Sequence, residues 1–216
     1  MHKSVEKLIH IKKLVKSKES DFKKITIIAV SKTFGLDKIL PLVEYGHLHY
    51  GENKVQEALD KWSQLKLNKP EIKLHLIGKL QTNKVKFAVK IFDFIHSVDS
   101  KKLVKKIAEE QLKQNKKVRI FIQVNIGNET QKSGIDKNDL KDLLLYCKSL
   151  NLEVVGLMCL PPIDCDPEPF FQQLNYLKKN LNLSELSMGM SSDYMKAINH
   201  SATYLRIGSE IFGQRN

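Results

Sequence analysis

Short apolar runs alternate along this sequence with amphipathic stretches of roughly ten to eighteen residues. Two of the runs, at 118–124 and 152–158, are mostly apolar, as in strands that are covered on both faces. This alternation is typical of βα units around a parallel sheet. We predict strands at 25–31, 47–51, 73–78, 93–98, 118–125, 153–160, 185–189 and 203–208.

Amphipathic segments follow these strands, several of them after a residue suited to N-capping. The predicted helices begin near Leu36, Val55, Asn83, Ser100, Asp136, Pro167 and Ser192. Another amphipathic helix, from Lys3 to Lys16, precedes the first strand. Eight alternations favour a closed α/β structure, a (β/α)8 TIM barrel with an extra N-terminal helix, over an open doubly wound sheet. Because 216 residues suit one such barrel, we expect a single domain spanning residues 1–216.

The net charge of +12 raises the question of a nucleic-acid surface. Of the 36 cations, however, only Arg119, Arg206 and Arg215 are arginines, and base readout favours the planar guanidinium. The lysines alternate with acidic residues along helical segments instead of forming one basic block. We therefore expect a lysine-rich solvated surface and no specific nucleic-acid partner.

No stretch approaches the ~18 uncharged apolar residues of a membrane span, and the N-terminal segment has no uninterrupted apolar core of a leader peptide. Three cysteines, Cys147, Cys159 and Cys165, show neither C-x-x-C nor zinc-ligand spacing. These features predict free thiols and a cytoplasmic location, with no membrane association and no metal.

Polar residues at the carboxyl ends of the strands are the candidates for chemistry, because barrel sites form there. Lys32 follows the first predicted strand, where low-dielectric surroundings would lower its amine pKa toward a nucleophilic form. A solvated surface lysine is the alternative interpretation. In Gly189-Met190-Ser191-Ser192 and Gly208-Ser209, glycine and a following helix suit an anion such as phosphate. Turn-forming glycines and helix-capping serines are the alternative there.

Arg206 interrupts the apolar eighth strand in a chain that otherwise avoids arginine. An inward-facing arginine needs an acceptor, such as a ring nitrogen, a phosphate or a buried carboxylate. An edge-facing salt bridge explains it equally well. His75 and His96, in the third and fourth strands, are interpreted as hydrogen-bonded core or mouth histidines and not as general bases.

Motifs along almost the whole chain resemble the pyridoxal phosphate homeostasis proteins. They are Ala29-Val30-Ser31-Lys32-Thr33, Gly51-Glu52-Asn53, His75-Leu76-Ile77-Gly78, His96-Ser97-Val98-Asp99, Lys132-Ser133-Gly134, Gly156-Leu157-Met158, Ser187-Met188-Gly189-Met190-Ser191 and Arg206-Ile207-Gly208. One departure is Ser209-Glu210, where Thr-Ala is common in the family, and it keeps a hydroxyl. Thr130 and Gln131 stand in a loop that varies within the family.

The resemblance implies a fold type III barrel, like the N-terminal domain of alanine racemase, that carries pyridoxal 5'-phosphate as a Schiff base on Lys32. It also implies Arg206 facing the pyridine nitrogen. The other cofactor-binding residues it implies are Asn53, Met190, Ser191, Gly208 and Ser209.

An arginine beside the pyridine nitrogen leaves that nitrogen unprotonated, which disfavours carbanion chemistry. A racemase also needs a second acid or base, which in the resembling enzyme comes from a further β-domain that we do not expect after Asn216. The resemblance therefore implies a monomeric, non-enzymatic carrier in vitamin B6 homeostasis that exchanges its cofactor with amino acids or pyridoxal phosphate-dependent apoenzymes. Weak racemase or lyase activity is one alternative, and a cofactor-free Schiff-base aldolase on Lys32 is another.

Overall fold

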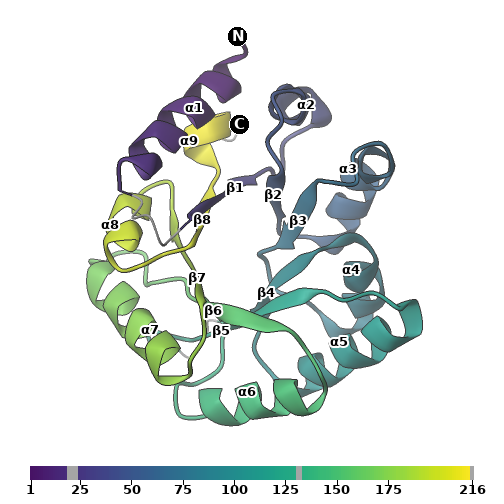
Figure 1. The fold of residues 1–216 in the computed structure, drawn as a ribbon, viewed down its shortest axis with the longest axis vertical. Helices are drawn as coiled ribbons and strands as arrows, with labels where there is room; N and C mark the ends of the chain where they lie inside the picture. The colour runs from purple at the N-terminus through teal and green to yellow at the C-terminus, as the bar shows by residue number, and fades with distance from the viewer. Residues whose placement is uncertain (19–23, 130–132, 215–216) are drawn as a thin grey trace.

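The computed structural model describes residues 1–18, 24–129 and 133–214. Thr130, Gln131 and Lys132 of the loop and motif named above, together with Arg215 and Asn216, lie outside these residues. Eight parallel strands pair in sequence order, and the eighth closes on the first to form a barrel (Figure 1). This confirms the (β/α)8 barrel predicted from the alternation of apolar runs. The strands are β1 Thr26–Val30, β2 His49–Glu52, β3 Lys73–Leu76, β4 Phe94–Val98, β5 Arg119–Gln123, β6 Val154–Met158, β7 Glu185–Met190 and β8 Tyr204–Ile207.

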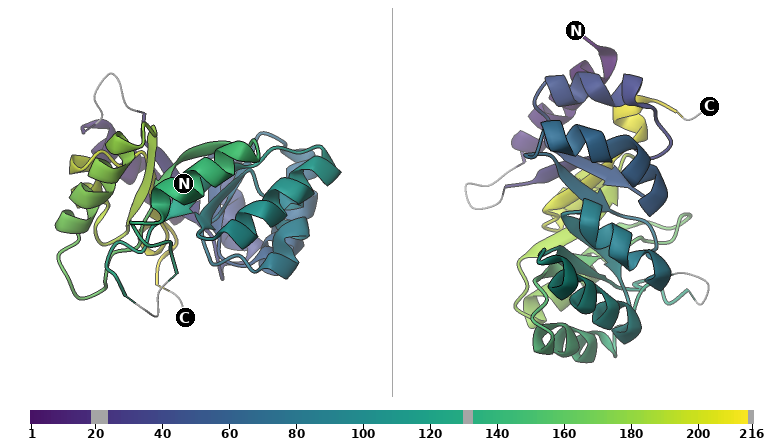
Figure 2. Two further views of the ribbon diagram at one scale, coloured as in Figure 1. Left: turned by 90° about the horizontal axis from the view of Figure 1, so that it is seen from below. Right: turned by 90° about the vertical axis from the view of Figure 1, so that its right-hand side faces the viewer.

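Helices surround the barrel and cover the outer faces of its strands (Figures 1 and 2). They are α1 Lys3–Lys16, α2 Leu36–Glu44, α3 Val55–Asn68, α4 Val85–Ile91, α5 Lys101–Gln114, α6 Leu140–Ser149, α7 Glu168–Asn180, α8 Tyr194–Asn199 and α9 Ser209–Phe212, with the 3₁₀ turn η1 Thr82–Lys84. No helix among the described residues is long and apolar enough to cross a membrane.

Local sequence explains where α5 begins and ends. The Ser100 hydroxyl accepts a hydrogen bond from the Leu103 amide at 3.4 Å, as an N-cap does. Asn115 ends the helix in the left-handed region, with φ 46°. The helix buries Leu103, Val104 and Ile107 at helical spacing.

Two helices begin later than the sequence indicated. The helix expected near Asp136 begins at Leu140, because the Asp136 carboxylate accepts from the Asn138 amide at 2.8 Å and forms a turn. The helix expected near Ser192 begins at Tyr194, since Asp193 accepts from the Met190 amide at 2.6 Å. Short polar side chains compete with the helix for backbone groups in both places.

The N-terminal helix α1 was predicted with its observed bounds, and it buries Val5, Leu8, Ile11 and Val15. It lies beside α2 and α9, near the closure between β1 and β8 (Figure 1). The segment Ile211-Phe212-Gly213, which we expected to be a short tail, is partly helical, and Ile211 in α9 is buried. The helix α1 therefore covers the seam where the barrel closes.

Candidate functional site

A cavity of about 690 Å³ opens at the carboxyl ends of the barrel strands. All seven residues that the resemblance implied for cofactor binding line it: Lys32, Asn53, Met190, Ser191, Arg206, Gly208 and Ser209. They come from the ends of β1, β2, β7 and β8 and from the loops that follow. The structure thus brings all seven residues together around one cavity, and their role in cofactor binding stays a prediction.

The backbone around Lys32 turns sharply after β1. Thr33 takes a left-handed conformation with φ 68°, which is unfavourable for a residue with a branched Cβ. Such a conformation persists only where surrounding contacts impose it. Two side chains of α3 supply those contacts.

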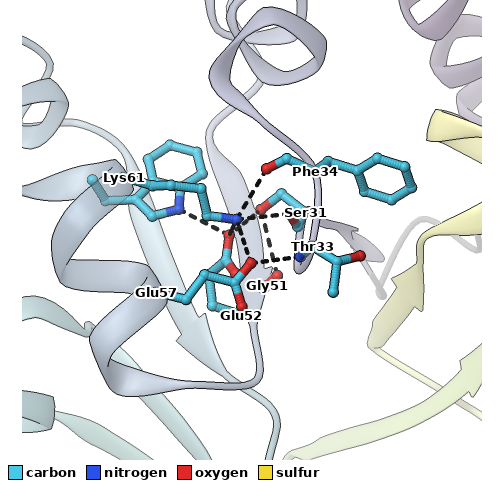
Figure 3. Close-up of polar contacts among 8 residues, drawn as sticks. Ser31, Thr33, Phe34, Gly51, Glu52, Glu57 and Lys61 are labelled. Carbon is cyan, nitrogen blue, oxygen red and sulfur yellow. Dashed lines mark hydrogen bonds and ion pairs between the residues drawn. The ribbon is translucent and has the colours of Figure 1, made fainter. Parts of the chain in front are cut away.

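Lys61 and Glu57 of α3 bind the backbone on both sides of Lys32 (Figure 3). The Lys61 amine donates to the carbonyl oxygens of Ser31 at 2.9 Å and Phe34 at 3.2 Å. The Glu57 carboxylate accepts from the Thr33 amide at 2.5 Å. Lys61 also pairs with Glu57 at 2.9 Å, so one helical turn fixes the loop that carries Lys32.

The carboxylate of Glu52 lies beneath this loop and is fully buried. Its Oε1 accepts from the Ser31 hydroxyl at 2.7 Å and the Trp62 indole at 3.0 Å, and it pairs with Lys61 at 2.8 Å (Figure 3). A buried carboxylate is tolerated only when it is paired and hydrogen-bonded. We call Glu52, Glu57 and Lys61 the loop clamp.

The opposite wall of the cavity is built where β7 meets β8. The register between these strands shifts between Ser187 and Met190, and Gly189 has φ +88°. A Cβ on Gly189 would lie 2.7 Å from the Ala197 Cβ, so glycine is required for the turn and for close packing against α8. The turn directs the chain so that Met190 and Ser191 line the cavity.

Ser191 joins the two glycine loops. Its hydroxyl oxygen accepts from the backbone amides of Gly208 at 3.2 Å and Glu210 at 3.4 Å. Hydroxyls of Ser191 and Ser209 and the backbone of Gly208 therefore share one wall. Hydroxyl and amide donors of this kind suit a phosphate.

Arg206 points into the barrel and is only 4% exposed. Its Nη1 donates to the Ser187 hydroxyl at 2.7 Å, and its Nη2 donates to the Cys159 carbonyl at 2.9 Å. Burial lowers the pKa of this guanidinium from its ordinary value, although an arginine keeps its proton at neutral pH. Within the described residues no carboxylate lies within ion-pairing distance of Arg206, so the edge-facing salt bridge is wrong.

The charge of the cavity follows from this composition. Lys32 and Arg206 are basic, and no acidic side chain is among the described residues that line the cavity. Three serines, Ser191, Ser192 and Ser209, add hydroxyl groups. This set of donors suits an anionic ligand that also carries an acceptor for the guanidinium.

The sequence matches the family described as "Alanine racemase, N-terminal domain" over residues 9–216. It is 40% identical over 199 residues to a protein of Aquifex aeolicus named "Pyridoxal phosphate homeostasis protein", covering 88% of this chain and 86% of the relative. A human protein of the same name is 36% identical over 210 residues, covering 88% of this chain and 76% of the relative. The chain belongs to the pyridoxal phosphate homeostasis protein family.

Solved structures support the assignment of the chain to this family. PipY of Synechococcus elongatus, solved without PLP, is 32% identical with a TM-score of 0.90, covering 98% of this chain and all of that one. PipY with PLP bound superposes with a TM-score of 0.85. Alanine racemase of Clostridium difficile, at 14% identity and a TM-score of 0.77, shares the fold, and this chain covers 57% of it.

Sequence reasoning missed the loop clamp of this family member. Glu57 and Lys61 stand four residues apart on a helix, which in a lysine-rich chain predicts an exposed ion pair. The one Trp of the chain, Trp62, was a usable signal, because a fully buried indole needs an acceptor for its N–H. It donates to Glu52.

A smaller cavity of about 250 Å³ adjoins the main one and also escaped the sequence analysis. The two share Asn53, Ile77 and Leu160. Lys79 stands three residues after the end of β3 and lines the smaller cavity but not the main one. Lys79 is therefore a lysine of similar position to Lys32 that lies outside the main cavity.

Proposed function

We propose that this protein binds pyridoxal 5'-phosphate, keeps it attached to Lys32, and takes part in vitamin B6 homeostasis without strong catalytic activity. The observation that carries the proposal is the cavity lined by Lys32, Arg206 and three serines with no acidic side chain among its described residues. Pyridoxal phosphate supplies an aldehyde that condenses reversibly with a primary amine and loses water. The names of the relatives and the PLP-bound PipY structure support the choice of ligand.

Different residues of the cavity bind different parts of the cofactor in this proposal. Ser191, Gly208 and Ser209 supply hydroxyl and amide donors for the phosphate, and Arg206 supplies a guanidinium for the ring nitrogen. Asn53 supports the ligand from the end of β2, and Met190 contributes apolar surface at the rim. The loop clamp keeps the Lys32 backbone in place between these walls.

The proposal of weak catalytic activity rests on the side chains that line the cavity. Arg206 keeps its proton, so it gives none to a ring nitrogen and leaves a bound ring a poor electron sink. Lys32 and Arg206 are the only Lys, Arg, His, Asp or Glu side chains among the described residues that line the cavity. Because Arg206 keeps its proton, none of these side chains supplies a second acid or base for a substrate bound at Lys32. The side chains therefore favour retention of the cofactor and its transfer to another amine over turnover.

We propose that the protein works in the cytoplasm. The three cysteines are free thiols, which fits the reducing cytoplasm. We propose that the protein is a monomer that releases the cofactor to amino acids or to apoenzymes that require it.

The test is covalent trapping. Purified protein is mixed with pyridoxal phosphate, reduced with borohydride and digested, and the modified peptide is identified by mass spectrometry. We expect a yellow protein that bleaches on reduction, with the adduct on Lys32, and no yellow colour in Lys32→Ala. Lys79→Ala is the matched control and should stay yellow.

A Lys32→Ala variant that is as yellow as the wild type, or an adduct on other lysines, would contradict the proposal. Assays of amino-acid racemisation and of lyase activity on the same sample then test whether the protein lacks strong catalytic activity. Turnover at rates ordinary for such enzymes would overturn the non-catalytic role.

A further inference from the structure

A line of hydrogen-bonded side chains crosses the interior of the barrel and ends at Arg206. His49 Nδ1 lies 2.9 Å from His75 Nε2, and His75 Nδ1 lies 3.0 Å from His96 Nε2. His96 Nδ1 lies 2.8 Å from the Ser187 hydroxyl, which also accepts from Arg206 at 2.7 Å. Five strands, β2, β3, β4, β7 and β8, each contribute one member. We call these five residues the histidine chain.

Water is excluded from the middle of the histidine chain. His75, His96 and Ser187 have no exposed surface. The His75 ring stacks on Phe94 at 4.4 Å between centroids, and the His96 ring stacks on Phe121 at 4.2 Å. Burial holds the pKa of both imidazoles well below the usual value, and the Arg206 charge adds to this effect on His96. Both rings are therefore neutral at pH 7.

The direction of every hydrogen bond follows from the arginine. Arg206 only donates, so the Ser187 oxygen accepts from it. The remaining contact of the Ser187 hydroxyl among the described residues is His96 Nδ1, so its hydrogen goes there. A neutral His96 then carries its proton on Nε2 and donates to His75 Nδ1.

The direction of the hydrogen bonds continues through the second ring. His75, having accepted on Nδ1, carries its proton on Nε2 and donates to His49 Nδ1. The reverse direction would leave the Ser187 hydrogen without an acceptor in a water-free site, which costs about 1–3 kcal/mol. One charged group thus sets the tautomers of the buried rings.

We infer that His96, acting through Ser187, is a positioning residue that fixes the orientation of the Arg206 guanidinium without neutralising its charge. A carboxylate in the place of Ser187 would orient Arg206 equally well, but it would form an ion pair and remove the charge that a ligand needs. A hydroxyl that is itself committed to a neutral histidine accepts from one guanidinium nitrogen. The Cys159 carbonyl accepts from the other at 2.9 Å.

The role of this arrangement toward a pyridine nitrogen rests on the proposed function. The orientation of Arg206 does not, because it is built entirely from side chains of this protein. The histidine chain can therefore be tested on protein that contains no cofactor.

The first measurement is ¹⁵N NMR of the histidine side chains in ligand-free protein. We expect His75 and His96 to be neutral at pH 7 with the proton on Nε2. A proton on Nδ1 of either ring, or a charged imidazole, would overturn the inference. If the Nε2 tautomers are found and the trapping experiment with pyridoxal phosphate fails, the proposed function falls and the histidine chain stands.

The second measurement follows the Arg206 guanidinium by ¹H–¹⁵N NMR in three variants. His96→Leu removes the acceptor for Ser187, and we expect the separate Nη signals of Arg206 to merge as the group begins to rotate. His96→Gln provides both an amide oxygen and an N–H, so it should restore separate signals. His47→Gln changes another buried histidine outside the chain and should leave the Arg206 signals unchanged.

A purely structural role for His96 predicts that the Arg206 signals persist in His96→Leu whenever the variant folds. That result would overturn the inference. If His96→Leu does not fold, Ser187→Ala makes the same break at the next residue, and Ser187→Thr restores the hydroxyl. Persistent signals in folded Ser187→Ala would likewise contradict the role of the chain.

Discussion

The Lys61 amine lies 2.8 Å from the Oε1 of Glu52, a carboxylate with no exposed surface. The second oxygen of Glu52 is buried and has no hydrogen-bond partner among the described residues. Lys61 is thus the cation that compensates the buried charge of Glu52. The same amine binds two carbonyl oxygens of the loop that carries Lys32. Stability of the barrel and placement of Lys32 consequently depend on one ion pair.

Replacing Lys61 by Met should destabilise the protein strongly. The change leaves Glu52 buried without its counter-charge, and breaking one partner of a buried pair costs about 3–5 kcal/mol. Urea unfolding measures the loss. Lys196→Met is the matched control, because Lys196 pairs with Asp166 where both side chains are about half exposed, and its loss should cost under about 1 kcal/mol.

Adding Glu52→Gln to Lys61→Met should recover part of the lost stability, since it removes the uncompensated charge. A double variant that is less stable than Lys61→Met alone would show that the charge of Glu52 is not the source of the loss. Equal small effects of Lys61→Met and Lys196→Met would contradict the prediction as well.

Gly78→Ala should weaken both the fold and the cofactor site. A Cβ at position 78 would lie 2.4 Å from the backbone oxygen of Asn53, so the loop after β2 must shift. Overpacking of this kind costs about 1–3 kcal/mol. Unfolding and the dissociation constant for pyridoxal phosphate should both change. Gly35→Ala, whose Cβ would meet only the carboxylate end of Asp37, should alter neither by a comparable amount.

Ser191→Ala should weaken binding of pyridoxal phosphate about tenfold, the equivalent of ~1.4 kcal/mol for one lost hydrogen-bonding group. We propose that the Ser191 hydroxyl binds the phosphate, and the same oxygen accepts from the backbone amides of Gly208 and Glu210, which fixes its position. Pyridoxal, which has no phosphate, should bind the variant and the wild type alike. An equal loss for both ligands in fluorescence titrations would place Ser191 elsewhere than at the phosphate.

The barrel could be predicted from the sequence because most strands are separate, largely apolar runs bounded by polar residues. The pattern located all eight strands within a few residues. The late starts of α6 and α8 could not be read from it, since Asp136 and Asp193 bind neighbouring amides through their side chains. Such local turns depend on geometry that a hydrophobic period does not encode.

The site was predictable only in part for a similar reason. The position of Lys32 at a strand end made it one candidate among many lysines, and the family resemblance selected it. The histidine chain joins residues that lie far apart in the sequence, such as His96 and Ser187, and the loop clamp binds the backbone of a loop more than 20 positions before it. Their types, a helix ion pair and interior histidines, are common in proteins that have no such networks. Only the folded barrel brings these groups together.

Acid should destabilise the protein as the pH falls below about 6.5, because several histidines are buried in the neutral form. Burial lowers the pKa of His47 to about 3 and holds those of His75 and His96 well below the usual value. The unfolded chain binds these protons near pH 6.5, whereas the folded protein does not. The stability contributed by these neutral histidines is therefore fully present above about pH 6.5, and it falls as the pH decreases below that value. At pH 5 each such histidine costs roughly 2 kcal/mol.

Urea midpoints measured between pH 7 and pH 5 report the number of protons taken up on unfolding. His47→Gln should reduce that number by about one at pH 5, because Gln can keep the donor to the His49 carbonyl at 2.9 Å without a titrating group. Leu112→Gln, at an exposed position of α5, changes no titratable group and should leave the pH slope unchanged. Wild-type stability that stays constant down to pH 5 would contradict the prediction. It would mean that the buried imidazoles are protonated in the folded protein, which their burial and hydrogen bonds do not allow.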